Sequence, residues 1–145
     1  MNRSFIGADP GKQGGISIIF SNGLVSCFKM PESLRDLCDL VESFKSEDFM
    51  PHAFIEKVHA VKGNGISSTF TFGMGFGSLL TAFTAAKIPF SLVTPQKWQK
   101  ELGCLTGGDK NISKARAQQL FPHIKVTHAI ADSLLIAEYC RRTIK

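Results

Sequence analysis

Residues 5–20 of the chain read FIGADPGKQGGISIIF, two short apolar runs joined by a glycine-rich turn. The pattern predicts a β-hairpin, because apolar runs bounded by turn residues favour strands. The first strand is expected to end at Asp9, since Pro10 cannot donate to a sheet ladder. An acid at a strand end, beside glycines that allow a close approach to the backbone, suits a metal ion that contacts a phosphate. The plainer interpretation, an Asp that only stabilises its own turn, stays open on these residues alone.

The segments that follow the hairpin predict a mixed α/β sheet. Residues 24–29 read as a third strand that completes an antiparallel meander. An amphipathic helix is expected over residues 31–49, with Ser33 and Asp36 resembling a capping box. Residues 53–55 then form a short apolar run of the buried parallel type, which ends in Glu56.

The second half of the chain predicts alternating helices and one more strand. A helix capped by Ser67 or Ser68 is expected to run to about residue 86, and its glycines imply close packing against the sheet or a partner subunit. A strand over residues 89–94 leads into a helix that begins at Thr94-Pro95 and carries Trp98. Further helices are expected over residues 112–121 and from residue 127 onward. Together with the meander, this order predicts a five-stranded sheet flanked by helices.

Length and composition predict one globular domain over residues 1–145. The hydrophobic content is 43%, which is enough for a real core in a chain of 145 residues. No stretch approaches the roughly 20 apolar residues of a membrane helix, and no signal peptide is recognisable. The four cysteines form no C-x-x-C motif and are expected to be reduced thiols, which favours a cytoplasmic protein.

The charge of the chain is unevenly distributed. The net charge is +5, and six of the twelve acids lie between residues 32 and 48. The remaining surface is therefore basic, and residues 95–125 carry six Lys or Arg against two acids. This distribution fits a polyanionic partner, although an ordinary basic protein would show the same modest charge.

Three acids stand at positions where a sheet would bring them together. Asp9 and Glu56 end strands, and Asp132 lies in about the first turn of the last helix. Ligands gather at the strand ends of α/β sheets, and carboxylates that meet there repel each other unless cations join them. Carboxylates suit Mg²⁺ or Mn²⁺, and two such ions about 4 Å apart can drive phosphodiester hydrolysis. Each acid also has a simpler interpretation when it is considered singly. Glu56 could pair with Lys57 or Lys62, and Asp132 could compensate the helix dipole.

The three motifs in this order resemble those of RuvC-type Holliday junction resolvases. Asp9-Pro10-Gly11 resembles the first catalytic motif of that family, Ile55-Glu56-Lys57-Val58 the second and Ala131-Asp132-Ser133-Leu134 the last. The resemblance covers nearly the whole chain. It implies an RNase H-like fold and a homodimer that nicks two strands of a four-way DNA junction symmetrically. It also implies Mg²⁺ as cofactor, with two ions expected and Mn²⁺ as a substitute.

The resemblance departs from the family at the fourth metal ligand. The family places an Asp or His three residues before the last Asp, and that position is Ala129 in this chain. The nearest residue able to bind a metal is His128, which becomes a candidate ligand and catalytic residue. The family also places a lysine near the scissile phosphate. Lys114 resembles it, with Lys110 as a nearby alternative, and a lysine that only contacts DNA or solvent is an equally good interpretation.

Several further residues are candidates for contact with DNA. The resemblance implies that the helix after the second motif forms the dimer and reaches into the junction. Phe70 and Phe72 on it are candidates for unstacking bases, although helix aromatics more often belong to the core. The candidate phosphate contacts are Lys57, His59, Lys62, Lys110 and Arg116.

Other functions remain open at the level of sequence. An RNase H-like nuclease that acts on structured RNA or other branched DNA would carry the same acids. A junction-binding protein without catalysis is a second alternative, which the presence of all three acids argues against. An actin-like or sugar-kinase-like ATP binder would need a second domain, for which 145 residues leave no room.

Overall fold

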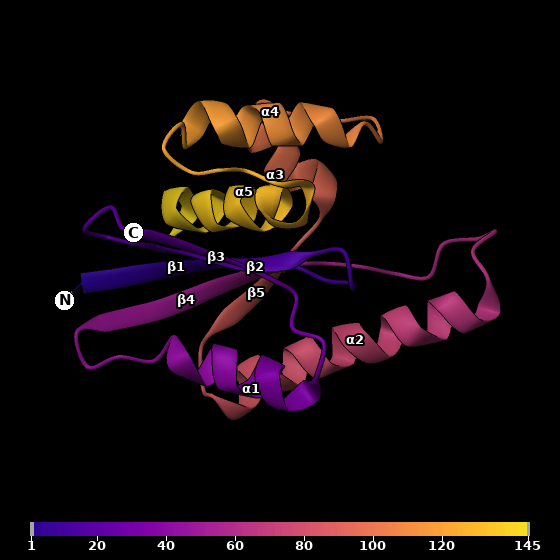
Figure 1. Cartoon of the computed structure of the whole chain (residues 1–145), viewed down its shortest axis with the longest axis horizontal. Coiled ribbons are helices and arrows are strands. Elements are labelled where there is room, and N and C mark those ends of the chain that lie inside the picture. The colour runs from indigo at the N-terminus through magenta and orange to yellow at the C-terminus, as the bar shows by residue number, and fades with distance from the viewer. Residues whose placement is uncertain (1, 145) are drawn as a thin grey trace.

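A computed structural model describes residues 2–144, and its centre is a five-stranded sheet in the order β3-β2-β1-β4-β5 (Figure 1). The strands β1, β2 and β3 pair antiparallel, whereas β4 and β5 run parallel to β1. The predicted α/β architecture, a meander joined to parallel strands in a mixed sheet, is therefore confirmed. The strands are β1 (Asn2–Asp9), β2 (Gly15–Phe20), β3 (Val25–Lys29), β4 (Phe49–Glu56) and β5 (Phe90–Val93).

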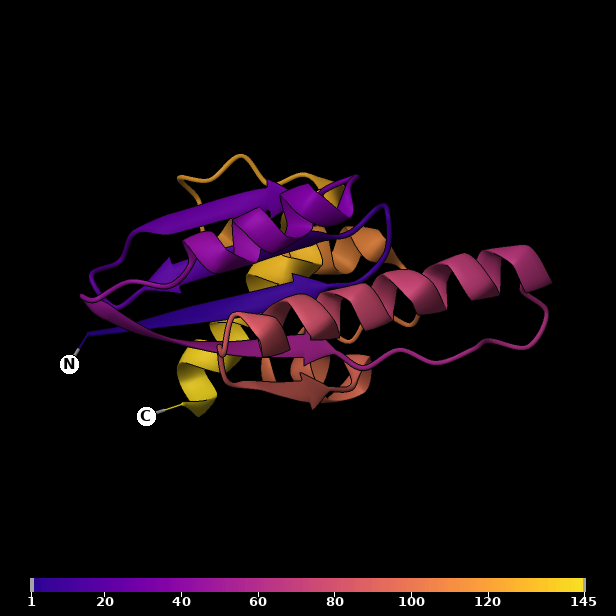
Figure 2. The same cartoon turned by 90° about the horizontal axis from the view of Figure 1, so that it is seen from below.

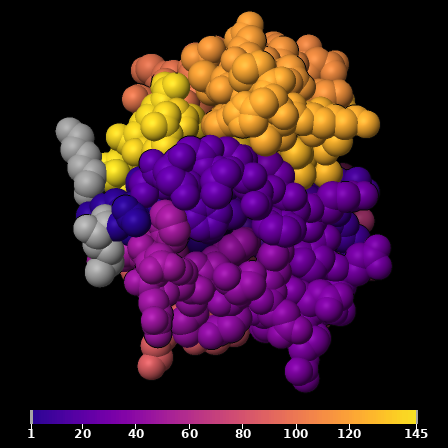
Figure 3. Space-filling model, turned by 60° about the vertical axis from the view of Figure 1, so that its left-hand side comes forward, coloured from indigo at the N-terminus to yellow at the C-terminus, as the bar shows by residue number. Residues whose placement is uncertain are grey.

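Helices cover both faces of the sheet. One face carries α1 (Leu34–Ser43) and α2 (Ile66–Ala85), and the other carries α3 (Pro95–Glu101), α4 (Lys110–Leu120) and α5 (His128–Thr143) (Figure 1). In the space-filling view the orange and yellow C-terminal segment forms a layer against the indigo and purple N-terminal segment (Figure 3). Strand residues alternate between the two apolar cores: Phe5 joins the α5 side, and Ile6 joins the α1 and α2 side.

The N-terminal half of α2 extends beyond the edge of the sheet (Figures 1 and 2). Both ends of the chain lie at the opposite end of the molecule. The glycines of α2 were expected to pack closely, but a Cβ added at Gly73, Gly75 or Gly77 would meet nothing within 4 Å. Within residues 2–144 these glycines meet no neighbour, so the predicted packing against the sheet is wrong, while packing against a partner subunit stays a prediction.

The helix predicted over residues 31–49 is shorter than the sequence pattern indicated. It spans only Leu34–Ser43, and the Ser33 hydroxyl accepts the predicted capping hydrogen bond from the Asp36 N–H at 3.0 Å. Phe49, expected to end this helix, instead begins β4 opposite Asn2. Its ring packs edge-on against Phe20 at 5.0 Å, so a tertiary contact decides its conformation.

The strand predicted over residues 53–55 is longer than expected. It spans Phe49–Glu56 and includes Pro51. The pairing of β4 with β5 begins only at Ala53, opposite Phe90. At Pro51 the strand therefore has a paired neighbour on one side only, where a proline without an N–H is tolerated.

The helix starts in the second half agree with the sequence in some places and differ in others. Thr94 caps α3 and Pro95 is its first residue, as predicted. Gly65 rather than Ser67 or Ser68 precedes α2. Asp109 caps α4 through the Asn111 N–H at 3.0 Å, so this helix begins two residues earlier than expected, at Lys110.

No helix within residues 2–144 combines the length and the apolar character needed to cross a membrane.

Candidate active site

The parallel pairing of β1 and β4 brings two of the predicted acids to one edge of the sheet. Ala8 pairs with Ile55, and Asp9 and Glu56 are the next residue of each strand. Because parallel strands end at the same edge, both carboxylates emerge side by side. The sheet register alone therefore accounts for two of the three predicted acids.

Small residues bring the third acid to the same edge by letting α5 lie directly on the sheet. A Cβ at Gly7 would collide with the backbone of Ser133 and Ala137. A Cβ at Gly15 would lie 2.7 Å from the Ala129 carbonyl oxygen. The hydroxyls of Ser17 and Ser133 are 2.7 Å apart in the buried contact. This close approach fixes the start of α5, and with it Asp132, beside the β1–β2 hairpin.

Asp132 lies in the second turn of α5 rather than in its first. The helix begins at His128 after the N-cap residue Thr127, so Asp132 is its fifth residue. The sequence placed it in about the first turn, where an acid serves to compensate the helix dipole. Its position one turn further along favours the interpretation that it serves the cavity.

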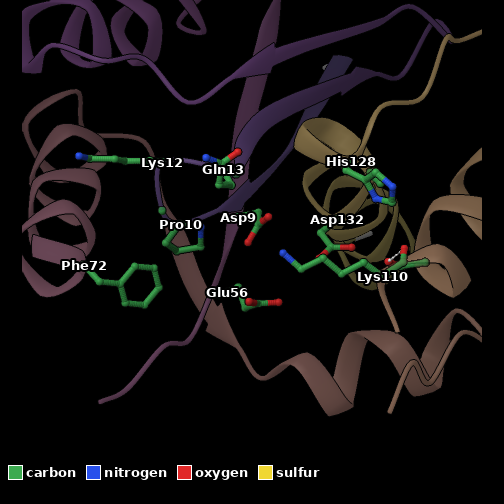
Figure 4. Close-up of a pocket in the computed structure, with 13 residues that line it drawn as sticks. Asp9, Pro10, Lys12, Gln13, Glu56, Phe72, Lys110, His128 and Asp132 are labelled. Carbon is green, nitrogen blue, oxygen red and sulfur yellow. Dashed lines mark hydrogen bonds between the residues drawn. The ribbon is translucent and has the colours of Figure 1, made fainter. Parts of the chain in front are cut away.

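The three carboxylates line one cavity of about 380 Å³ (Figure 4). Asp9, Glu56 and Asp132 surround the open space, and the ammonium group of Lys110 extends between them. Residues 10–14 of the hairpin turn form another wall, and Phe72 reaches it from α2. The remaining lining residues are Ser113, His128 and Ala131.

Burial raises the pKa of all three carboxyl groups, and repulsion by neighbouring acids adds to the rise at Asp9 and Glu56. The pKa of Asp9 lies well above its usual value, chiefly because the group is buried and further because Glu56 and Asp132 repel it. Burial also raises the pKa of Glu56 and that of Asp132. The positive charge of Lys110 opposes the shift at all three groups. Concentrated negative charge of this kind is typical of functional sites.

Two neighbouring side chains that the sequence did not single out contact the carboxylates. The indole Nε1 of Trp98 donates to Glu56 Oε2 at 2.8 Å. The Ser113 hydroxyl, which donates to the Lys110 carbonyl at 3.1 Å, also opposes the rise in the pKa of Asp132. Both contacts join residues distant along the chain, so no local sequence signal could have revealed them.

The donor set fits a divalent metal ion. Carboxylate oxygens are the ligands that Mg²⁺ and Mn²⁺ prefer, and Mg²⁺ is commonly held by one or two carboxylates together with substrate phosphates. In the side-chain positions of residues 2–144, no three His, Cys, Asp or Glu side chains cluster closely enough to hold one ion. The cavity thus offers separate carboxylates around an open space rather than an all-protein cage.

The structure separates the candidate histidine and the two candidate lysines. His128 lines the cavity and its charge acts on Asp132, on the same face of α5. Lys110 also lines the cavity, as the first residue of α4. Lys114, half-buried one turn later, is not part of the lining. The geometry therefore favours Lys110, the alternative, over Lys114.

The residues predicted to contact DNA occupy different environments. Lys57, His59 and Lys62 are exposed in the segment between β4 and α2. Phe70 is exposed on the protruding half of α2, whereas Phe72 faces the cavity. Arg116 is already engaged within the chain, because its Nε donates to the Leu102 carbonyl at 2.8 Å. Only part of its guanidinium remains for a ligand.

Comparison with known proteins identifies structural relatives only. No protein-family model and no curated protein sequence matches the chain. The structure of T. thermophilus RuvC in complex with Holliday junction substrate is similar, with a TM-score of 0.61 and 17% identity over 97% of this chain and 96% of that one. The fold is RuvC-like. A second Thermus thermophilus RuvC structure has a TM-score of 0.58 and 16% identity over 92% and 90% of the two chains.

The predicted RNase H-like fold of RuvC type is thereby confirmed along nearly the whole chain. At this sequence identity the likeness concerns the course of the backbone. The roles of the residues in this cavity rest on its own geometry.

Proposed function

We propose that the chain is a metal-dependent endonuclease that resolves four-way DNA junctions by paired symmetric nicks. One observation carries the proposal: three carboxylates from β1, β4 and α5 line a single cavity with Lys110, in a RuvC-like fold. The similar T. thermophilus RuvC was solved with a Holliday junction substrate. Branched DNA is therefore the first substrate to test.

Asp9, Glu56 and Asp132 would hold the metal, with His128 as a further ligand. When bound there, Mg²⁺ ions supply the Lewis acidity that activates a water and stabilises the leaving oxygen of a phosphodiester. The chain itself supplies buried oxygen ligands whose negative charge a cation would balance, and repulsion by neighbouring acids already raises the pKa of Asp9 and that of Glu56.

Lys110 has a distinct role in this proposal. Its ammonium extends into the cavity (Figure 4), where a scissile phosphate would carry the growing negative charge. A fixed cation at that position stabilises the transition state more than the ground state. The lysine also balances the three carboxylates when no phosphate is present.

A homodimer completes the proposal, because symmetric nicks require two copies of the cavity related by a twofold axis. The exposed cations Lys57, His59 and Lys62 would contact the DNA backbone beside the cavity. Phe72, which reaches the cavity from α2, would contact an unstacked base there.

The experiment is cleavage of an end-labelled synthetic four-way junction with Mg²⁺, with Mn²⁺ and with EDTA. We expect paired nicks at symmetric positions that require metal and disappear in Asp9→Asn. The matched control is Asp39→Asn, which removes an exposed acid on α1 and should cleave as wild type does.

Each alternative predicts a different result in the same assay. Binding of the junction without nicks under every metal would contradict the proposal and favour a non-catalytic junction binder. Cleavage of structured RNA with no cleavage of any branched DNA would replace the substrate class. Cleavage that persists in Asp9→Asn would remove the cavity from the reaction.

A further inference from the structure

A part-buried hydrogen bond at the candidate site joins Glu56 to the only tryptophan of the chain. The side chain of Trp98 is fully buried, and its indole N–H donates to Glu56 Oε2 at 2.8 Å. A buried indole N–H requires an acceptor, and an ionised carboxylate gives a shorter and stronger hydrogen bond than a neutral group does. A core position that needed only apolar volume could hold Phe instead. The pairing of a buried indole with a carboxylate therefore indicates a role beyond filling the core.

One strand pair fixes both partners of this contact. Glu56 pairs with Val93 in the register of β4 and β5, and the Lys57 N–H donates to the Val93 carbonyl at 2.7 Å. Thr94, the next residue, caps α3 and so sets the direction of that helix. Trp98 lies one turn into α3. The backbone around Glu56 and the helix that carries the indole are consequently held in one rigid unit.

The contact engages only one of the two carboxylate oxygens of Glu56. Oε2 receives the indole hydrogen bond, while the Glu56 side chain lines the cavity with Asp9 and Asp132 (Figure 4). A carboxylate on a long Glu side chain has several rotamers, and a hydrogen bond to one oxygen limits the positions of the other. In proteins generally, hydrogen bonds to metal-binding side chains hold those side chains in the orientation that binds the metal.

We propose that Trp98 is a positioning residue that orients the Glu56 carboxylate toward the metal in the cavity. The inference rests on the proposed function, because it assigns Glu56 to metal binding. It goes further in making the affinity for metal depend on an indole N–H in the core. Trp98 itself touches neither metal nor substrate.

The hydrogen bond can be tested independently of any activity. With one tryptophan, the ¹H–¹⁵N spectrum of the full chain contains a single indole resonance. We expect its proton to move upfield in Glu56→Gln, because the charge-assisted bond is weakened. Asp9→Asn, which removes a neighbouring charge without removing the acceptor, should change it far less. An indole resonance that is the same in Glu56→Gln and in wild type would overturn the inference.

The positioning role is tested by Mn²⁺ affinity, measured by electron paramagnetic resonance on the wild type and on Trp98→Phe. We expect the dissociation constant to rise about 10-fold, as is typical when such a contact is lost. Junction cleavage should recover as Mg²⁺ is raised, since the half-saturating concentration increases while the maximal rate changes little. A purely structural defect would lower the active fraction at every concentration.

Two further variants separate orientation from packing. Benzothienylalanine at position 98 keeps the shape of the ring but lacks the N–H, so it should reproduce the loss of affinity even if Trp98→Phe folds poorly. Leu102→Val removes volume from the same core cluster without touching Glu56, and it should bind Mn²⁺ as wild type does. If both position-98 variants bind Mn²⁺ as tightly as Leu102→Val does, the inference is overturned while the proposed function stands. A wild-type chain that binds no Mn²⁺ would overturn the proposed function as well.

Discussion

At the scale of single residues, the carboxyl group of Asp9 has a pKa well above its usual value. Its carboxyl group is buried and is repelled by Glu56 and Asp132. A folded-state pKa above the unfolded value favours folding while the group is protonated, and this contribution is lost as the pH rises through the folded pKa. Without metal, Asp9 therefore makes the fold less stable at neutral pH than at acidic pH.

Because the raised pKa of Asp9 lowers stability at neutral pH, we predict that Asp9→Asn stabilises the protein while removing its activity. In EDTA at pH 7 the free energy of unfolding should rise by about 1 kcal/mol, the usual gain from relieving a strained functional site. The difference from wild type should shrink as the pH falls toward 4, where Asp9 is increasingly protonated in both states. Chemical denaturation at several pH values measures both effects. A destabilised Asp9→Asn at pH 7 would contradict the electrostatic argument.

Lys110 and Lys114 offer a second comparison at this scale, because they are one turn apart on α4 and only Lys110 lines the cavity. Lys110→Ala should lower the single-turnover rate of junction cleavage about 100-fold, as expected for loss of one transition-state contact. Lys114→Ala should change that rate only a few-fold. The reverse order would return the catalytic lysine to the position that the family resemblance indicated.

At the scale of elements, the glycines divide into those that a neighbouring backbone requires and those that face open space. Gly7 lies where α5 meets β1, and a Cβ there collides with the backbone of Ser133 and Ala137. Backbone atoms cannot move aside as a flexible side chain can, so α5 would have to shift with Asp132 on it. A Cβ at Gly75 in α2 meets nothing within 4 Å.

Alanine at these two positions should therefore have opposite effects. Gly7→Ala should destabilise the protein by about 3 kcal/mol, within the range for overpacked cores. Gly75→Ala should stabilise α2 by roughly 1 kcal/mol, the difference in helix propensity between the two residues. Thermal unfolding of both variants beside the wild type measures the contrast. Equal effects would show that α5 does not depend on its approach at Gly7.

The same elements show what local sequence could and could not predict. The hairpin, the meander and the Thr94-Pro95 helix start follow from turn and capping residues, and each was predicted. The helix expected over residues 31–49 ends at Ser43, because Phe49 is held by pairing with β1 and by the ring of Phe20. Such tertiary contacts leave no trace in local periodicity, which is why this boundary was wrong.

At the scale of the whole molecule, the site was predictable where topology alone positions a residue. Asp9 and Glu56 end parallel strands, so the sheet must bring them together. The Trp98–Glu56 contact spans 42 residues and depends on the direction of a short helix, which no motif specified. The choice of Lys110 over Lys114 similarly depended on where α4 begins, two residues before the predicted start.

The last prediction concerns the protruding half of α2. Ile66 is 92% exposed, Phe70 69% and Met74 59%, and their spacing of four residues places them along one face of the helix. A surface of this kind marks an interaction site, and the proposed symmetric nicks call for a second copy of the chain. We therefore expect α2 to contact the partner chain through this face.

Sedimentation velocity over a range of concentrations tests this expectation. The wild type should have about twice the chain mass of 15.9 kDa, and Met74→Glu should dissociate it, because a charge would be buried against apolar side chains. Ser68→Glu is the matched control, since it adds the same charge at an exposed position roughly 120° or more around α2 from Ile66, Phe70 and Met74. Under the proposed mechanism, the Met74→Glu monomer would retain the cavity but lose the second copy of it. It should therefore nick junctions singly rather than in symmetric pairs. The contradicting result is a wild type that stays monomeric at every concentration and still makes paired nicks. Symmetric cleavage would then not depend on dimerisation.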